Sequence, residues 1–164
     1  MATITDDFNR SNGALGADYT RGRGPTNGVS IASNAARISN ASADCSYIRN
    51  DSFGDDQEAF VTITSGMAAG TGYAEIAVRA SGQDGTYQDY SVYTDGTSGA
   101  GHTAISRVNA NSGTELKAVS TTFSGSDELG IRVTGSDPVV ISLLKNGTVV
   151  DSYSDSSGSR ISSG

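Results

Sequence analysis

The chain has 164 residues, with 18 acidic and 11 basic side chains and a formal net charge of −7. This length fits one domain, residues 1–164, that could bury roughly 70% of its unfolded surface. The negative charge would repel phosphate backbones, which argues against a nucleic-acid partner, and no apolar run reaches the roughly 18 residues of a membrane span. The single cysteine, Cys45, cannot form an internal disulfide.

Apolar and polar residues alternate along most of the chain, which predicts β-strands, whereas no helical i, i+3, i+4, i+7 stripe persists. In chain order the predicted strands are Thr3–Phe8, Gly28–Ser33, Ala36–Ser39, Ser46–Asn50, Gln57–Ser65, Gly72–Ala80, Tyr87–Thr94, Thr103–Asn109, Thr114–Ser120, Glu128–Gly135, Val139–Lys145 and Thr148–Ser154. Clusters of Gly, Ser, Asn and Asp separate these short, evenly spaced strands. The pattern predicts an all-β fold, either a sandwich or a barrel. The polar residues 155–164 are expected to form a loop.

The strongest turn signal is Asn146-Gly147, since both residues tolerate the positive φ of a two-residue type I′ turn. Such a turn would pair Leu144 with Val149 and Leu143 with Val150. This arrangement places apolar side chains on both faces, so we expect the hairpin to be well buried.

A second hairpin is predicted from strands 72–80 and 87–94, in a register that pairs Arg79 with Tyr87 and Ala77 with Asp89. One face of this hairpin is expected to pack against the core, and the other, the wet face, is expected to be exposed to solvent. The wet face would present tyrosines among charged groups, the usual composition of a shallow sugar-binding groove. Its predicted ligand-binding residues are Tyr73, Glu75, Arg79, Tyr87, Asp89 and Tyr93.

Catalytic residues are not predicted, and the chain is not expected to be an enzyme. Glycoside hydrolysis needs two carboxyl groups about 5 to 10 Å apart. Glu75 stands alone on its strand, and Glu115 is expected to face Lys117 instead of a second acid. The only histidine, His102, is interpreted as a loop residue.

Acidic loop residues leave structural calcium open as a cofactor, because Ca²⁺ takes six to eight oxygen ligands in irregular geometry. The candidate ligands are Asp6, Asp7, Asn9, Asp55 and Asp56. The competing interpretation, which we favour, is that Asp and Asn stand at these positions because they form turns.

Several segments resemble the concanavalin A-like lectin/glucanase group, in particular the LamG-like jelly-roll domains of phage virion proteins. They are Asp6–Arg10 with Gly13–Gly16, Phe53–Gln57, Ala77–Ala80 and Leu144–Thr148. The resemblance implies an antiparallel β-sandwich, a jelly roll of two packed sheets. The concave face and the rim loops of this fold bind glycans, sometimes with Ca²⁺.

The chain departs from the family pattern at two places. Tyr19 stands where the family has Trp, and the sequence stops at the Gly-rich turn that the family follows with a further strand. A partner chain or a further C-terminal segment would then complete the sheet, or its edge stays open.

The resemblance, together with a start that lacks the pattern of an export signal, favours a non-catalytic virion surface module. We expect a phage capsid decoration or a tail or fibre component, assembled in the host cytoplasm and exposed outside the cell. Its expected partners are other virion subunits, cell-surface glycans and further copies of itself. The alternative is a bacterial cell-surface or secreted carbohydrate-binding module.

Overall fold

A computed structural model describes residues 4–26, 28–38, 44–64, 73–95 and 102–163. Every regular element in these ranges is a β-strand, and all the strands pair antiparallel. Within the same ranges the structure holds no helix that could cross a membrane. The prediction of an all-β chain is confirmed.

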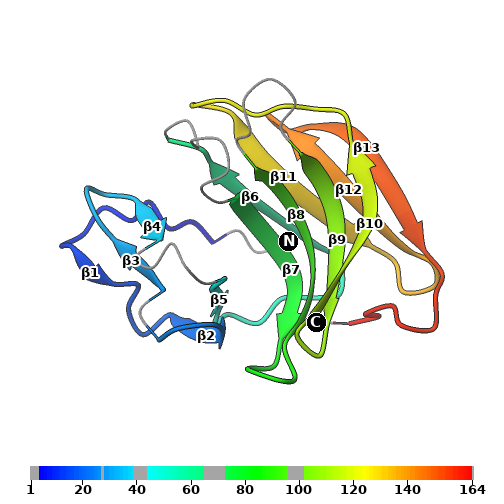
Figure 1. Cartoon of the computed structure of the whole chain (residues 1–164), viewed down its shortest axis with the longest axis horizontal. Coiled ribbons are helices and arrows are strands. Elements are labelled where there is room, and N and C mark those ends of the chain that lie inside the picture. The colour runs from blue at the N-terminus through cyan, green and yellow to red at the C-terminus, as the bar shows by residue number, and fades with distance from the viewer. Residues whose placement is uncertain (1–3, 27, 39–43, 65–72, 96–101, 164) are drawn as a thin grey trace.

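Two four-stranded sheets form the body of the molecule (Figure 1). One sheet has the order β10-β9-β8-β7, with strands β7 (Tyr73–Ser81), β8 (Gln88–Asp95), β9 (Thr103–Asn109) and β10 (Ser112–Val119). The other has the order β13-β12-β11-β6, with strands β6 (Gln57–Thr62), β11 (Glu128–Thr134), β12 (Val139–Lys145) and β13 (Thr148–Asp155). Each sheet is therefore built mainly from hairpins of consecutive strands.

The two sheets share one apolar core. Alternate residues of β7, β8 and β9, such as Val78, Tyr90 and Ile105, contribute one half, and Ile131 and Ile141 of β11 and β12 belong to the other. Alternation along a strand sends every second side chain to the opposite face. The second face of the β7–β10 sheet consequently points away from the core.

Five shorter strands lie beside this body, at the left of Figure 1. They are β1 (Gly13–Ala14), β2 (Tyr19–Arg23), β3 (Val29–Ile31), β4 (Ala36–Ile38) and β5 (Ser46–Arg49). They form the sheets β1-β3-β4 and β2-β5. Strands β1 and β2 were not predicted, because their sequences, Gly-Ala and Tyr-Thr-Arg-Gly-Arg, show no apolar alternation.

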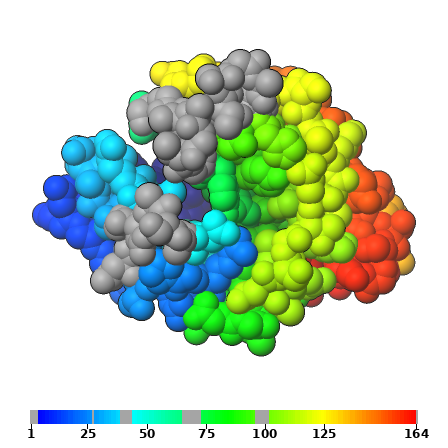
Figure 2. All heavy atoms as spheres, in the orientation of Figure 1, coloured from blue at the N-terminus to red at the C-terminus, as the bar shows by residue number. Residues whose placement is uncertain are grey.

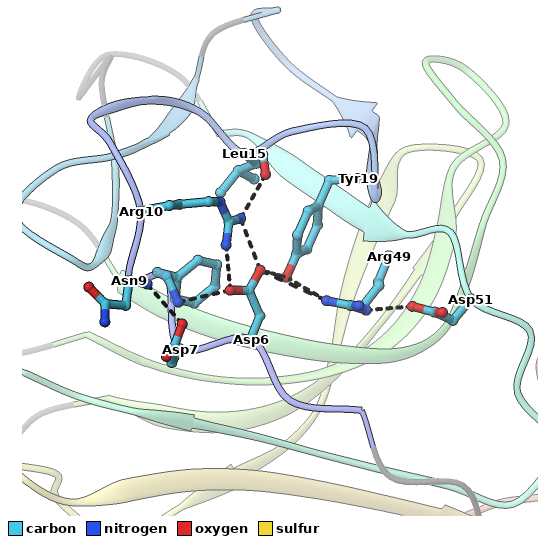
Figure 3. A network of polar contacts seen from close by, with 9 residues as sticks. Asp6, Asp7, Asn9, Arg10, Leu15, Tyr19, Arg49 and Asp51 are labelled. Carbon is cyan, nitrogen blue, oxygen red and sulfur yellow. Dashed lines mark hydrogen bonds and ion pairs between the residues drawn. The ribbon is translucent and has the colours of Figure 1, made fainter.

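The predicted strand Thr3–Phe8 is wrong over its described part, residues 4–8, which form no strand. Asp6 turns the chain there, since its Oδ1 accepts a hydrogen bond from the Phe8 amide at 2.8 Å. The same carboxylate binds the Arg10 guanidinium at 2.6 Å and the Tyr19 hydroxyl at 2.9 Å (Figure 3). Bonding to Arg10 holds the pKa of Asp6 well below its usual range. Asp6 thereby joins the N-terminal segment to β2.

The hairpin at Asn146-Gly147 has positive φ at both turn residues, 52° and 74°, as predicted. Leu144 pairs with Val149, but a bulge then pairs Leu143 with Asp151 instead of with Val150. Leu143 and Leu144 are fully buried, whereas Val149 and Val150 are 45% and 41% exposed. The expectation of a hairpin buried throughout is therefore wrong for its second strand.

The C-terminal residues 156–163 contain no strand, in agreement with the predicted loop, yet they are anchored. Ile161 is 4% exposed within the core. Its amide donates to the Tyr90 hydroxyl at 3.1 Å, and its carbonyl accepts from Arg79 at 2.6 Å. One apolar side chain and two buried hydrogen bonds thus hold a segment whose composition is that of a loop.

Candidate functional site

A groove of about 330 Å³ lies on the face of the β7–β10 sheet that points away from the core. Figure 2 shows this face hollowed between the blue N-terminal strands and the yellow-green β10. The groove is lined by Arg23, Tyr73, Glu75, Tyr93, Ser106, Val108, Gly113, Thr114 and Glu115. Three of these residues, Tyr73, Glu75 and Tyr93, are among the predicted ligand-binding residues, because they alternate on two neighbouring strands.

Two tyrosines form an aromatic wall of the groove. Tyr93 pairs across the strands with Glu75, which places it diagonal to Tyr73, and their ring centroids lie 5.7 Å apart at an interplanar angle of 58°. The imidazole of His102, which is not among the residues that line the groove, lies next to Tyr93 with its centroid 5.7 Å from that of the tyrosine ring. Tilted rings at this spacing attract one another and offer an extended apolar surface.

Glu115 is held at the edge of the groove by two neighbours. Its Oε2 lies 2.6 Å from Nε2 of His102 and 2.9 Å from the Tyr93 hydroxyl. The hydrogen bonds from His102 and from Tyr93 lower the pKa of Glu115. His102 is therefore a loop residue that also binds a side chain of the groove, Glu115. Only the pairing of β9 with β10 could reveal this contact.

The expectation that Glu115 faces Lys117 is wrong. A bulge between these residues pairs Glu115 with Ser106 and Lys117 with Ile105, which belongs to the core side. Lys117 instead binds Asp151 of β13 at 2.6 Å. A single inserted residue, Leu116, thus separates two charges that simple alternation would have placed together.

Glu75 lines the groove together with the two tyrosines, and it is half-buried. Burial raises its pKa from 4.5 to about 7, and the charge of Asp89 adds to the increase. Both carboxyl groups interact with Ser91, the residue between them on this face. At neutral pH Glu75 therefore exists in both its protonated and its ionised form.

Tyr87 and Asp89 lie on the predicted ligand-binding face of the hairpin, but this part of the face is not exposed to solvent. Tyr87 is 2% and Asp89 is 1% exposed, since β2 and β5 cover them. A Cβ on Gly22 of β2 would come within 2.5 Å of the Tyr87 ring. The Tyr87 hydroxyl donates to Asp89 at 2.5 Å, and burial raises the pKa of Asp89.

The predicted register of this hairpin is displaced by two residues, because Ala77 pairs with Ser91 and not with Asp89. A bulge after Val78 and a φ of 51° at Arg79 end the regular alternation. Arg79 is fully buried and donates to the carbonyls of Asp55, Gly135 and Ile161, at 2.9, 2.6 and 2.6 Å. These bonds place Arg79 at the C-terminal segment and not in the groove.

Arg23, the last residue of β2, was missed by sequence analysis. The sequence Arg21–Gly24 is one short basic segment in an acidic chain with no aromatic residue interleaved, which predicts a solvated loop. In the structure the Arg23 guanidinium stands over the Tyr87 ring, with its Cζ 5.8 Å from the centroid, and lines the groove. Only the packing of β2 against β8 brings it there.

Of the five candidate calcium ligands, Asp6, Asp7 and Asp56 use a carboxylate oxygen in a turn, an ion pair or another hydrogen bond. Asp6 binds Arg10 and Tyr19, and Asp7 accepts the amide of Asn9 at 2.9 Å (Figure 3). Asp56 accepts the Gly135 amide at 2.9 Å, while the Asp55 carbonyl serves Arg79. Over the described ranges, no group of three or more His, Cys, Asp or Glu side chains could hold a metal ion.

Comparisons of the chain with protein-family models, with curated proteins and with solved structures found no match.

Proposed function

We propose that the chain is a non-catalytic recognition module that adsorbs to glycans through the groove on the β7–β10 sheet. The observation that carries this proposal is the tilted pair Tyr73 and Tyr93, flanked by the polar side chains of Glu75 and Glu115. Sugar rings present apolar C–H faces together with a rim of hydroxyls. An aromatic wall with polar groups fixed beside it matches both features.

A glycan array probed with the full chain tests this function. We expect retention of a subset of glycans, and a loss of about 5- to 10-fold in affinity for Tyr73→Ala and for Tyr93→Ala, since an aromatic contact contributes about 1 kcal/mol. Phe53→Ala, which alters an exposed aromatic residue outside the groove, should bind as the parent does. Repeating the array with EDTA tests a calcium requirement. The proposal fails if no glycan is retained.

One observation favours a second candidate function, a glycoside hydrolase. Glu75 and Glu115 line the same groove, and their pKa values are shifted in opposite directions. A protonated and an ionised carboxyl group are the acid and the nucleophile or base of such enzymes. Release of reducing sugar, abolished by Glu75→Gln but not by Glu58→Gln on the other sheet, would establish hydrolysis. Retention of intact glycan supports the binding module.

We further propose a jelly-roll fold of the concanavalin A-like type and a place on a virion surface, as a capsid decoration or a tail or fibre component. The segment resemblances and the presence of two sheets around one core support the fold proposal. A bacterial surface or secreted binding module is the alternative. Capsid and tail genes beside this one, and labelling of purified particles by an antibody against the chain, would favour the virion.

A further inference from the structure

Arg23 is a largely buried cation whose hydrogen-bonding groups are unused. Its side chain is 19% exposed, and its Nε is buried without a hydrogen-bond partner. The nearest carboxylate oxygen, Oδ2 of Asp44, lies 4.0 Å from Nη2, which is an ion pair but too long for a hydrogen bond. Among the parts of the chain that the structure describes, the Arg23 guanidinium donates no hydrogen bond to another residue.

Two other largely buried arginines of this chain use their terminal nitrogens as donors. Arg79 donates to three carbonyls, and Arg107 donates through Nη1 to Asp155 and Ser157, although the Nε of Arg107 is also buried without a partner. Buried donors are almost always paired, so an unpaired guanidinium calls for an explanation. Arg23 differs from the other two in lining the groove.

A guanidinium offers parallel N–H groups that match the two oxygens of a carboxylate. We propose that the ligand of the groove is an acidic saccharide whose carboxylate binds Arg23, while its ring lies against Tyr73 and Tyr93. This inference rests on the proposed function and names its substrate class. Protonated Glu75, in the same groove, can donate a hydrogen bond to the same sugar.

The net charge of the chain further restricts which acidic saccharides can bind. With a formal net charge of −7, the protein repels polyanions at long range, and Arg23 is the one basic side chain that lines this groove among the described residues. A single carboxylate within an otherwise neutral glycan can pair with Arg23 without this long-range repulsion. A densely charged polysaccharide would be repelled.

The test uses an array of matched glycans that differ in one uronate or sialate residue against its neutral counterpart. We expect the full chain to retain the carboxylate-bearing member at least tenfold more strongly, and Arg23→Gln to abolish this preference. Arg21→Gln is the matched control, because Arg21 lies on the same strand and pairs with Asp84 outside the groove. Arg23→Lys keeps the charge without the planar fork, and should retain only part of the preference.

A measurement on the unaltered chain avoids any effect of substitution on folding. The preference for the carboxylate member should be greater at pH 6 than at pH 8, because ionised Glu75 repels the ligand. Equal retention of both members, or a preference unchanged in Arg23→Gln, overturns this inference and leaves glycan binding intact. If the array retains no glycan at all, the proposed function fails and this inference fails with it.

Discussion

The carboxyl group of Glu75 should make the stability of this protein depend on pH. Its pKa in the fold, about 7, exceeds the unperturbed value of 4.5. Glu75 therefore ionises at a lower pH in the unfolded chain than in the fold. The stability that its protonated carboxyl group contributes at low pH is lost as pH rises from about 4.5 to 7, and the loss is constant above that range. A shift from 4.5 to about 7 corresponds to a loss of about 3 kcal/mol, since one pKa unit is about 1.4 kcal/mol.

Urea unfolding of the parent and of Glu75→Gln at pH 4, 5, 6, 7 and 8 measures this loss. Glutamine has nearly the same shape as glutamate and no charge. The free energy of unfolding of Glu75→Gln, relative to that of the parent, should therefore increase with pH by up to about 3 kcal/mol. Glu115→Gln is the control, because hydrogen bonds to His102 and Tyr93 lower the pKa of Glu115 and reverse the sign. A difference between Glu75→Gln and the parent that stays constant from pH 4 to 8 would refute the reasoning.

Three further substitutions test interactions that stabilise the fold. Gly22→Ala should destabilise the fold by about 1 to 3 kcal/mol in urea unfolding, because the new Cβ meets the Tyr87 ring, whereas Gly113→Ala, with nothing within 4 Å, should cost far less. Arg79→Met should cost about 3 kcal/mol or more, since it leaves carbonyls without a donor, and a melting temperature close to the parent's would contradict this role. Asp6→Asn should lower stability at pH 7, and the deficit should shrink as pH falls below the ordinary carboxylate pKa. Parallel pH profiles of the parent and Asp6→Asn would show that the ion pair with Arg10 contributes nothing.

Alternation of side chains was enough to predict the strands of both large sheets and part of the groove. Tyr73, Glu75 and Tyr93 share a face because a period of two is a local property, and it is unaffected by a register displaced by two residues. The turn at Asn146-Gly147 was predictable for the same reason, since its backbone conformation is chosen by the two residues themselves.

Bulges and contacts between distant segments could not be predicted in this way. The bulges near Arg79 and Leu116 each insert a residue, and every side chain beyond such a point changes its partner. Arg23 reaches the groove, and Tyr87 and Asp89 lose their exposure, only because β2 packs on β8. Strand identity follows from neighbours in the chain, whereas burial, pairing and charge environment follow from neighbours in space, which the order of residues does not specify by itself.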